Sequence, residues 1–362
     1  MDSSLTVEYN EETFTYDNNP DFNQEIDEQE GGYIEIAGSR MRPSLILFKV
    51  DPVAYHTVLV EFRQEEIETF KEVVFTRFPT PIAFNFERFE RGYENQQNRL
   101  QLLQDTWESV IYLLYALIIS EFRYFKFSML GTTIKPKQIV SDSLDDRLSI
   151  IAQLVTLAID EGYDLPCLNY ISADAVEKLR ELNRVRNKFS HSFAKTDSQC
   201  RQTISEYQSE VLAILQSISQ IRNIVLARYI SQEEDILSFR HEDFQGASLN
   251  RTLASKTISS AKIAQITNYL NNRNILAIYN EDIYCVSPFL HFKTDAIGNP
   301  RLCFYKKKKG SDSDLELLYE VLDGSGEIPL EEGQIRKADF IAAIDEIKML
   351  LPDLSGRGDG FA

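Results

Sequence analysis

Cysteine and histidine are scarce in this chain of 362 residues, which has four of each. No two cysteines are separated by only two residues, and no histidine lies at a spacing typical of zinc ligands. This pattern excludes a structural zinc site and predicts free, mostly buried thiols. No cofactor and no metal are expected. The cysteines are Cys167, Cys200, Cys285 and Cys303.

Basic residues are outnumbered, with 38 Lys and Arg against 56 Asp and Glu and a formal net charge of -18. A surface this acidic repels a polyanion over most of its area, which excludes a protein that coats itself in nucleic acid without specificity. A basic site for nucleic acid would have to be local. Residues 1–30 contain ten Asp or Glu and no Lys or Arg. Residues 1–43 are therefore predicted to be an acidic disordered tail.

Long apolar runs are also missing. The strongest run, Val110 to Ile119, is followed by Glu121 and Arg123, and it is shorter than the roughly twenty residues that span a bilayer. We predict a buried core helix there and no membrane partner. The first residues, MDSSLTVEYNEETF, lack the basic and apolar regions of an export signal. A cytoplasmic location is expected.

The periodicity of apolar residues predicts a mainly α fold class. Residues 44–83 contain SLILFKVDPVAYHTVLVE, whose Val, Leu, Phe and Tyr content predicts a short β-rich segment. Helical spacing follows over residues 84–230. An α+β domain that senses a signal or binds a partner is predicted over residues 231–352, with a flexible tail over 353–362.

Four helices are expected between residues 84 and 230, and an antiparallel four-helix bundle is the simplest way to bury their apolar faces. The last of them carries an apolar stripe at alternating spacings of three and four, which needs a partner helix. The predicted helices run from Phe84 to Phe127 with a kink near Gly92, from Ser143 to Gly162, from Ser172 through RVRNKFSHSF, and from Thr196 to about Ile230.

The C-terminal part combines helical and alternating patterns. A helix is expected around SSAKIAQITNYL and a β-hairpin over Asn274–Tyr279 and Ile283–Val286. RLCFY and LELLYEVL are further strand candidates, and a final helix is predicted from Lys337 to Leu351. The adjacent residues His241, Glu242 and Asp243 are not expected to converge on one point, so they predict no metal site.

The stretch RVRNKFSHSF, residues 184–193, places charged residues beside apolar ones. On a helical wheel that starts at Leu179, one apolar stripe is formed by Leu182, Val185, Phe189 and Phe193, and Arg186 falls inside it. A neighbouring polar flank is formed by Arg180, Arg184, Asn187 and His191. A guanidinium cannot lose its proton to escape burial, so it needs an anionic or hydrogen-bonding partner. Glu108, alone among the apolar residues of the first helix, is the candidate.

Two interpretations of this stretch stay open from the residues alone. In the first, Arg186 forms a structural ion pair with Glu108, and His191 is stabilised by the C-terminal end of the helix. In the second, an arginine and a histidine flank a phosphate, with the guanidinium binding its oxygens and the imidazole moving a proton.

The hexapeptide RNKFSH, residues 186–191, matches the R-x4-H signature of the HEPN (higher eukaryotes and prokaryotes nucleotide-binding) superfamily. The first helix, with QDTWESVIYLLYALIISE, is similar to family first helices in which a polar or acidic residue interrupts an apolar run. The resemblance covers residues 84–230 and implies a HEPN-like four-helix bundle. Many HEPN proteins are metal-independent endoribonucleases of toxin or antiviral systems, and they dimerise to build one composite site.

The resemblance implies a role for each motif residue. His191 would be the general acid or base at the RNA 2'-OH or the leaving oxygen, and Arg186 would hold the scissile phosphate. Asn187 would orient the phosphate or His191. Arg184 is an alternative to Arg186, since family spacings range from four to six residues. Glu108 would be a supporting residue that orients the others.

Further RNA contacts are expected from four basic residues, although the lysine run at 306–309 is more simply explained as a solvated hairpin loop. These residues are Arg180, Lys188, Lys306 and Lys307. The implied partners are an RNA substrate, a second copy in a homodimer, and an antitoxin or defence protein. Two alternatives remain: a non-catalytic HEPN interaction protein, or an unrelated helical scaffold.

Overall fold

The structure is a computed structural model that forms two compact units, Met1–Val73 and Val74–Ala362. It describes residues 5–9, 12–16, 34–36, 39–41, 47, 51–190, 196–234, 237–248, 252–294, 300–309, 316–322, 327–329 and 337–352. Of residues 5–41, 185–190 and 327–328 it describes the backbone alone.

The first unit contains two antiparallel hairpins and most of a long helix. The hairpins pair β1 (Leu5–Tyr9) with β2 (Glu12–Tyr16) and β3 (Ile34–Ile36) with β4 (Ser39–Met41). They lie within residues 1–43, for which a disordered tail was expected, and the rest of that range lies outside the described residues. Helix α2 (Pro52–Arg77) continues into the second unit.

Residues 44–83 do not form the β-rich segment expected from their composition. Where the structure describes them, they are mainly helical, with α2 followed by the start of α3 (Thr80–Arg91). Asp51 begins α2, because its Oδ1 accepts a hydrogen bond from the Ala54 amide at 3.0 Å and Pro52 occupies the first helical position. The Glu-rich stretch RQEEIETFKE then favours helix over strand.

In the second unit, two helices begin at the residues that the sequence patterns predict as N-caps. The Ser143 and Thr196 side chains cap α6 and α8 at the expected positions. The expected kink near Gly92 is a full break, after which Asn95 caps a new helix. The helices are α3, α4 (Gln96–Phe125), α5 (Pro136–Ile139), α6 (Leu144–Asp160), the 3-10 turn η2 (Pro166–Asn169), α7 (Ala173–Ser190) and α8 (Asp197–Ser217).

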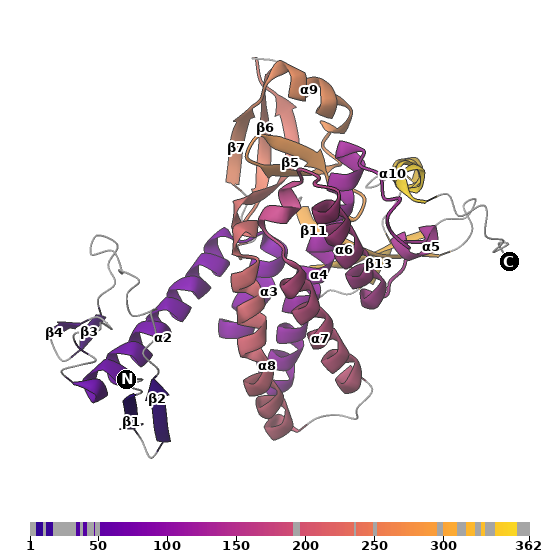
Figure 1. Cartoon of the computed structure of the whole chain (residues 1–362). Helices are drawn as coiled ribbons and strands as arrows, with labels where there is room; N and C mark the ends of the chain where they lie inside the picture. Colours follow the sequence, from indigo (N-terminus) through magenta and orange to yellow (C-terminus); the bar gives the residue numbers. More distant parts are fainter. Residues whose placement is uncertain are drawn as a thin grey trace. The chain divides into compact units, whose positions relative to one another are not determined.

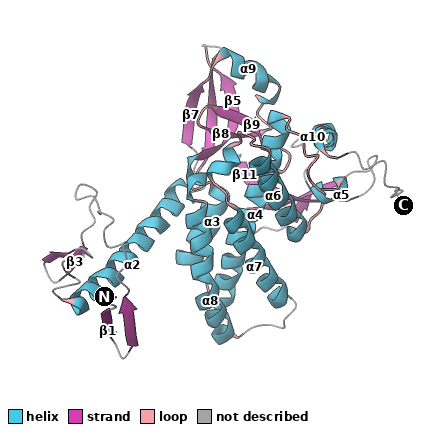
Figure 2. Cartoon of the chain, viewed as in Figure 1, coloured by secondary structure: helices cyan, strands magenta, loops and turns pink. Residues whose placement is uncertain are grey.

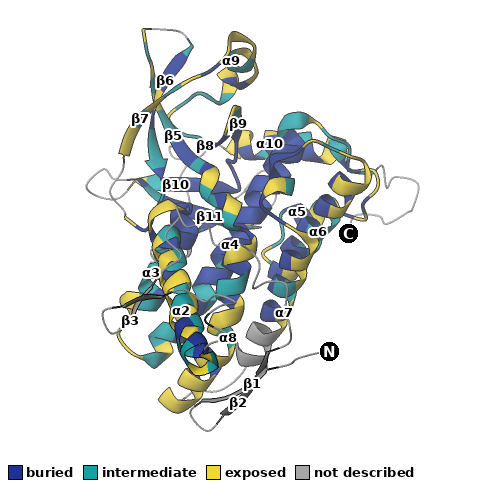
Figure 3. Cartoon of the chain, turned by 60° about the vertical axis from the view of Figure 1, so that its left-hand side comes forward, coloured by how far each residue is buried: buried dark blue, intermediate teal, exposed yellow. Residues whose placement is uncertain are grey.

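Four of these helices close into a ring. Helix α4 packs against α6 and α8, α6 packs against α7, and α7 packs against α8 (Figure 1). The middle of α4 is buried on nearly every side, as its dark colour shows (Figure 3). Among the described residues α4 is long and apolar enough to cross a membrane by length and composition, but 83% of that apolar window is buried in the protein. The expected core helix is confirmed.

The fourth helix is shorter than predicted. It ends at Ser217, a 3-10 turn η3 follows (Ser219–Asn223), and β5 begins at Ile224. Ile218 and Ile221 continue the helical spacing and are buried. The prediction that this helix continues to Ile230 was wrong. From Ile224 the chain forms a strand, and Ile224 and Leu226, which lie two residues apart, both point into the core as the two-residue period of a strand requires.

Two antiparallel sheets follow the helices, so the second unit is mixed α+β with its strands in the C-terminal part (Figure 2). The predicted hairpin is confirmed, with Tyr279 opposite Asp282. One sheet has the order β7-β6-β5-β8-β9 and the other β10-β11-β12-β13. The strands are β5 (Ile224–Gln232), β6 (Ser238–Phe244), β7 (Thr252–Thr257), β8 (Ile275–Tyr279), β9 (Asp282–Cys285), β10 (Leu290–Thr294), β11 (Pro300–Lys309), β12 (Glu316–Val321) and β13 (Glu327–Pro329).

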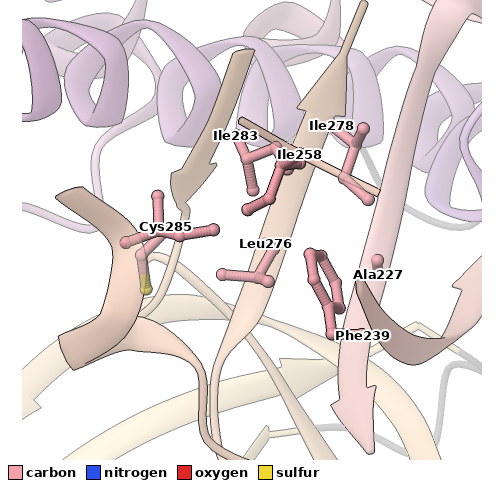
Figure 4. Close-up of a cluster of buried hydrophobic side chains, with 8 residues drawn as sticks. Ala227, Phe239, Ile258, Leu276, Ile278, Ile283 and Cys285 are labelled. Atoms are coloured by element: carbon pink, nitrogen blue, oxygen red, sulfur yellow. The ribbon is translucent and has the colours of Figure 1, made fainter. Parts of the chain in front are cut away.

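Three short helical segments accompany the sheets: α9 (Ser260–Ile266), the 3-10 turn η4 (Thr267–Tyr269) and α10 (Lys337–Leu350). Side chains from β5, β6, β8 and β9 form a buried apolar cluster with Ile258 and Ile266 of the α9 region (Figure 4). The four cysteines are buried and unbonded to one another, as predicted.

Two buried arginines attach the helices to the sheets. Arg123 of α4 donates to the backbone carbonyls of Cys285 at 2.8 Å and Ser287 at 3.2 Å. Arg147 of α6 donates to the carbonyls of Tyr305 at 2.8 Å and Lys306 at 3.0 Å. The boundary expected at residue 230 therefore lies inside one compact unit.

Candidate functional site

The predicted catalytic motif lies at the C-terminal end of α7. The helix runs to Ser190, so the backbones of Arg186, Asn187 and Lys188 belong to its last turns. The side chains of these residues, and the whole of His191, lie outside the described residues. The structure thus places residues 186–190 of the motif at the C-terminal end of α7, which is one helix of the four-helix ring.

Two arginines lie on the exposed flank of α7 that leads to the motif. Arg180 Nη1 and Arg184 Nη2 each lie 3.4 Å from a carboxylate oxygen of Glu177. The Arg184 side chain is 65% exposed, in agreement with the polar flank predicted by the helical wheel. Surface pairs of this kind are weak, on the order of 0.2–1 kcal/mol. Both guanidinium groups can therefore turn from Glu177 to another anion.

The opposite flank of α7 is fixed in the protein. Leu179 and Leu182 are buried, as the predicted apolar stripe requires. Asn183, which the sequence patterns missed, is also buried, and its Nδ2 donates to Asp145 Oδ1 of α6 at 2.7 Å. This contact sets the rotation of α7 and keeps the arginine flank on the surface.

Glu108 lies in a cleft between α3, α4 and the β10–β13 sheet. The cleft has a volume of about 410 Å³ when the open solvent at its mouth is included, and none of the described residues that line it belongs to α7. The predicted pair of Glu108 with Arg186 involves a side chain outside the described residues, so it stays a prediction. The lining residues are Asn85, Arg88, Asp105, Glu108, Ser109, Tyr112, Phe304, Glu320, Val321 and Leu322.

Asp105 is the carboxyl group most affected by this cleft. Burial is the main cause that raises its pKa to about 6, and the nearby charges of Glu108 and Glu320 act in the same direction. A hydrogen bond from Gln101 and the charge of Arg88 oppose the shift. The cleft is therefore an acidic site whose total charge changes slightly below neutral pH.

The two lysines proposed as RNA contacts lie on β11 rather than in a loop. The Lys306 ammonium is largely buried and contacts Glu320 and the Tyr112 hydroxyl, the latter at 2.6 Å. Lys307 Nζ lies 3.7 Å from Asp142 Oδ2 and is more exposed. Because Lys306 is directed inward, Lys307 is the more accessible of these two lysines.

His241, Glu242 and Asp243 are consecutive residues of β6. Residues two apart on a strand share a face, and His241 Nδ1 lies 2.6 Å from Asp243 Oδ1. Glu242 points to the other face, where its Oε2 lies 2.7 Å from Arg228 Nη2. The three side chains therefore do not converge on one point, as expected, although His241 and Asp243 form a pair on one face of the sheet.

Glu121 of α4 is the buried charged group that sequence patterns missed. It is fully buried, and its carboxyl group accepts three hydrogen bonds. Tyr170 Oη and Tyr284 Oη donate to Oε1 at 2.6 and 2.7 Å, and the Cys167 amide donates to Oε2 at 2.8 Å. Burial raises the pKa of Glu121 to about 7 against the opposing effect of these donors.

Comparisons with known proteins give no relative. No protein-family model, no curated protein and no solved structure matches the chain.

Proposed function

We propose that the protein is a HEPN-type endoribonuclease that cleaves RNA by attack of the 2'-OH on the neighbouring phosphate. One observation carries the proposal: RNKFSH begins in the last turns of the third helix of a four-helix ring, the place that the resemblance assigns to it. Helix α4, the first of the ring, carries the interrupted apolar run that the resemblance also requires.

In this proposal His191 moves the proton of the 2'-OH or of the leaving oxygen. Arg186, with Arg184 as the alternative, stabilises the charge that builds on the phosphoryl oxygens. Asn187 orients the phosphate or the imidazole. Arg180 and Arg184 extend a basic surface along α7 to which the RNA backbone binds once it displaces Glu177.

The proposal includes a homodimer, because one composite site needs two copies of the motif. An antitoxin or defence protein in the cytoplasm is the expected partner, and the C-terminal sheets are the expected place for it. Glu108 keeps its proposed supporting role, in which it would orient the other motif residues.

The test is RNA cleavage by the purified protein in EDTA. The residue types of RNKFSH supply no carboxylate pair and no Cys/His ligand set, so cleavage should not need a divalent ion. The products should end in a 2',3'-cyclic phosphate, and DNA and 2'-O-methyl RNA should stay intact. His191→Ala should lose roughly 10²- to 10⁴-fold in rate, whereas the matched variant Ser190→Ala should lose little.

Two results would overturn the mechanism: cleavage that depends on added Mg²⁺, or a His191→Ala variant as fast as the wild type. A wild type that cuts no RNA would leave the non-catalytic HEPN interaction protein as the better explanation. In the enzyme, Arg180→Ala and Arg184→Ala should weaken both RNA binding and cleavage.

A further inference from the structure

The Glu121 carboxyl group joins three parts of the second unit at one buried point. Its donors come from η2, which supplies the Cys167 amide and the Tyr170 hydroxyl, and from β9, which supplies the Tyr284 hydroxyl. Helix α7 starts at Ala173, three residues after Tyr170. The contact therefore fixes both the beginning of α7 and an edge strand of the five-stranded sheet to α4.

The groups around this carboxyl group are neutral. From η2 the titratable groups are Cys167 and Tyr170, and from β9 the group is Tyr284; burial raises the pKa of each well above its ordinary value. These three groups consequently carry no charge near neutral pH.

The charged side chain nearest along α4 is directed elsewhere. Arg123 donates to the Cys285 and Ser287 carbonyls, and its Nε lies 3.6 Å from Glu346 of α10. From β8, Tyr279 packs on the ring of Tyr170 and brings no charge. Among the described residues, none of the groups that shift the pKa of Glu121 is a cation.

We propose that Glu121 is a proton-controlled clasp. With its proton it holds η2 and β9 on α4, and its ionisation favours opening of this contact so that water can reach the carboxylate. A carboxylate buried without a cation is costly, and three hydrogen bonds from neutral donors offset only part of that cost. The clasp goes beyond the proposed function, and any effect on RNA cleavage through α7 rests on that function.

The direction of the effect follows from linkage. The closed state holds its proton up to about pH 7, whereas a hydrated glutamate loses it near 4.5. Opening therefore releases a proton between these values, and the equilibrium constant for opening rises by up to about tenfold per pH unit. Above about pH 7 both states are ionised, and the constant levels off. The clasp is tightest in acid and loosest above neutral pH.

Amide hydrogen exchange of the full chain, without RNA, tests the clasp. The amides of residues 165–176 and 279–286 are followed from about pH 5 to about pH 8, and each rate is divided by the base-catalysed intrinsic rate. The opening constant of the wild type should rise roughly 40-fold between about pH 5 and about pH 7. In Glu121→Gln it should change less than about threefold, because the side chain no longer titrates.

Two further variants test the role of Glu121 if Glu121→Gln does not fold. Tyr284→Phe removes one donor that favours the carboxylate, so the rise should extend to higher pH than in the wild type. Ser120→Ala changes a buried neighbour that does not titrate, and should keep the wild-type profile. An opening constant that is independent of pH in the wild type, or equally dependent in Glu121→Gln, would overturn the clasp. Since no RNA is present, this outcome is independent of whether the protein is a ribonuclease.

Discussion

At the scale of single residues, two carboxyl groups of α4, the buried Glu121 and the partly buried Asp105, show how environment decides charge. Glu121 has three donors and no cation, and Asp105 has one donor and two carboxylate neighbours, yet burial is the largest cause of the raised pKa in both. A group whose folded pKa is raised contributes stability below its unfolded pKa, and this contribution is lost as the pH rises through the folded pKa. Both groups therefore make the folded state less stable in mild alkali than in mild acid.

Asp105→Asn should stabilise the protein above neutral pH. The pKa of Asp105 is raised from 3.8 to about 6, so at pH 8 the folded state bears the cost of a buried charge that the unfolded state does not. Asparagine removes that charge and can still accept from Gln101. We expect a gain of about 1–2 kcal/mol in the free energy of unfolding at pH 8 and none at pH 4, measured by denaturant titration.

The control for this prediction is Asp164→Asn, because Asp164 is an exposed residue after α6. It should change the free energy of unfolding by less than about 0.5 kcal/mol at either pH. An equal gain from Asp105→Asn at both pH values would show that the carboxyl charge is not what destabilises the cleft.

At the scale of elements, local signals could be predicted and distant contacts could not. The starts of α6 and α8 follow from the side chains of Ser143 and Thr196, which lie next to the amides they cap. The end of α8 at Ser217 could not be predicted, because apolar residues continue at helical spacing beyond it until β5 begins at Ile224. The prediction of strands over residues 44–83 was wrong because β propensity depends on packing against neighbouring residues, which the composition alone does not reveal.

The same distinction holds for the candidate site. The exposed arginine flank of α7 follows from helical geometry within one element, so the sequence predicts Arg180 and Arg184 correctly as surface residues. The partners of Glu121 include Tyr284, which is 163 residues away along the chain. No spacing rule connects residues so far apart.

Gly246→Ala should destabilise the turn that joins β6 to the end of α2. Gly246 has φ of 71°, and a Cβ there would lie 3.0 Å from the Thr76 carbonyl oxygen and 3.1 Å from that of Phe75. The Gly246 amide also donates to the Phe78 carbonyl at 2.8 Å, so the turn cannot move away easily. We expect a loss of about 3 kcal/mol in the free energy of unfolding from backbone strain and overpacking together.

Gly162→Ala is the matched control. Gly162 has φ of 66°, but a Cβ there would meet no atom within 4 Å. Its cost should be about 1 kcal/mol, from the left-handed conformation alone. Equal losses for the two variants in denaturant titrations would show that the contact with α2 does not matter.

At the scale of the second unit, the helices and the sheets share one core. The Tyr112 ring of α4 stacks on Phe304 of β11 with centroids 5.2 Å apart, and the Tyr115 ring meets Phe289 edge-on at 5.4 Å. Arg123 and Arg147 add buried hydrogen bonds to strand carbonyls. The four-helix ring therefore depends on the sheets for part of its stability.

A fragment of residues 74–223 should consequently fail to fold cooperatively, whereas residues 74–352 should fold. In the whole protein, Tyr284 donates to Glu121, and Arg123 and Arg147 donate to backbone carbonyls of β9 and β11. Removing the sheets takes these partners away and exposes one side of α4. Each fully buried aromatic side chain contributes about 1.5–3 kcal/mol, so losing several contacts approaches the 5–15 kcal/mol that stabilises a typical domain. Thermal unfolding followed by circular dichroism should show one sharp transition for the longer fragment and a broad, gradual loss of helix for the shorter one. A sharp transition of the shorter fragment within a few degrees of the longer one would mean that the helical ring is an independent domain after all.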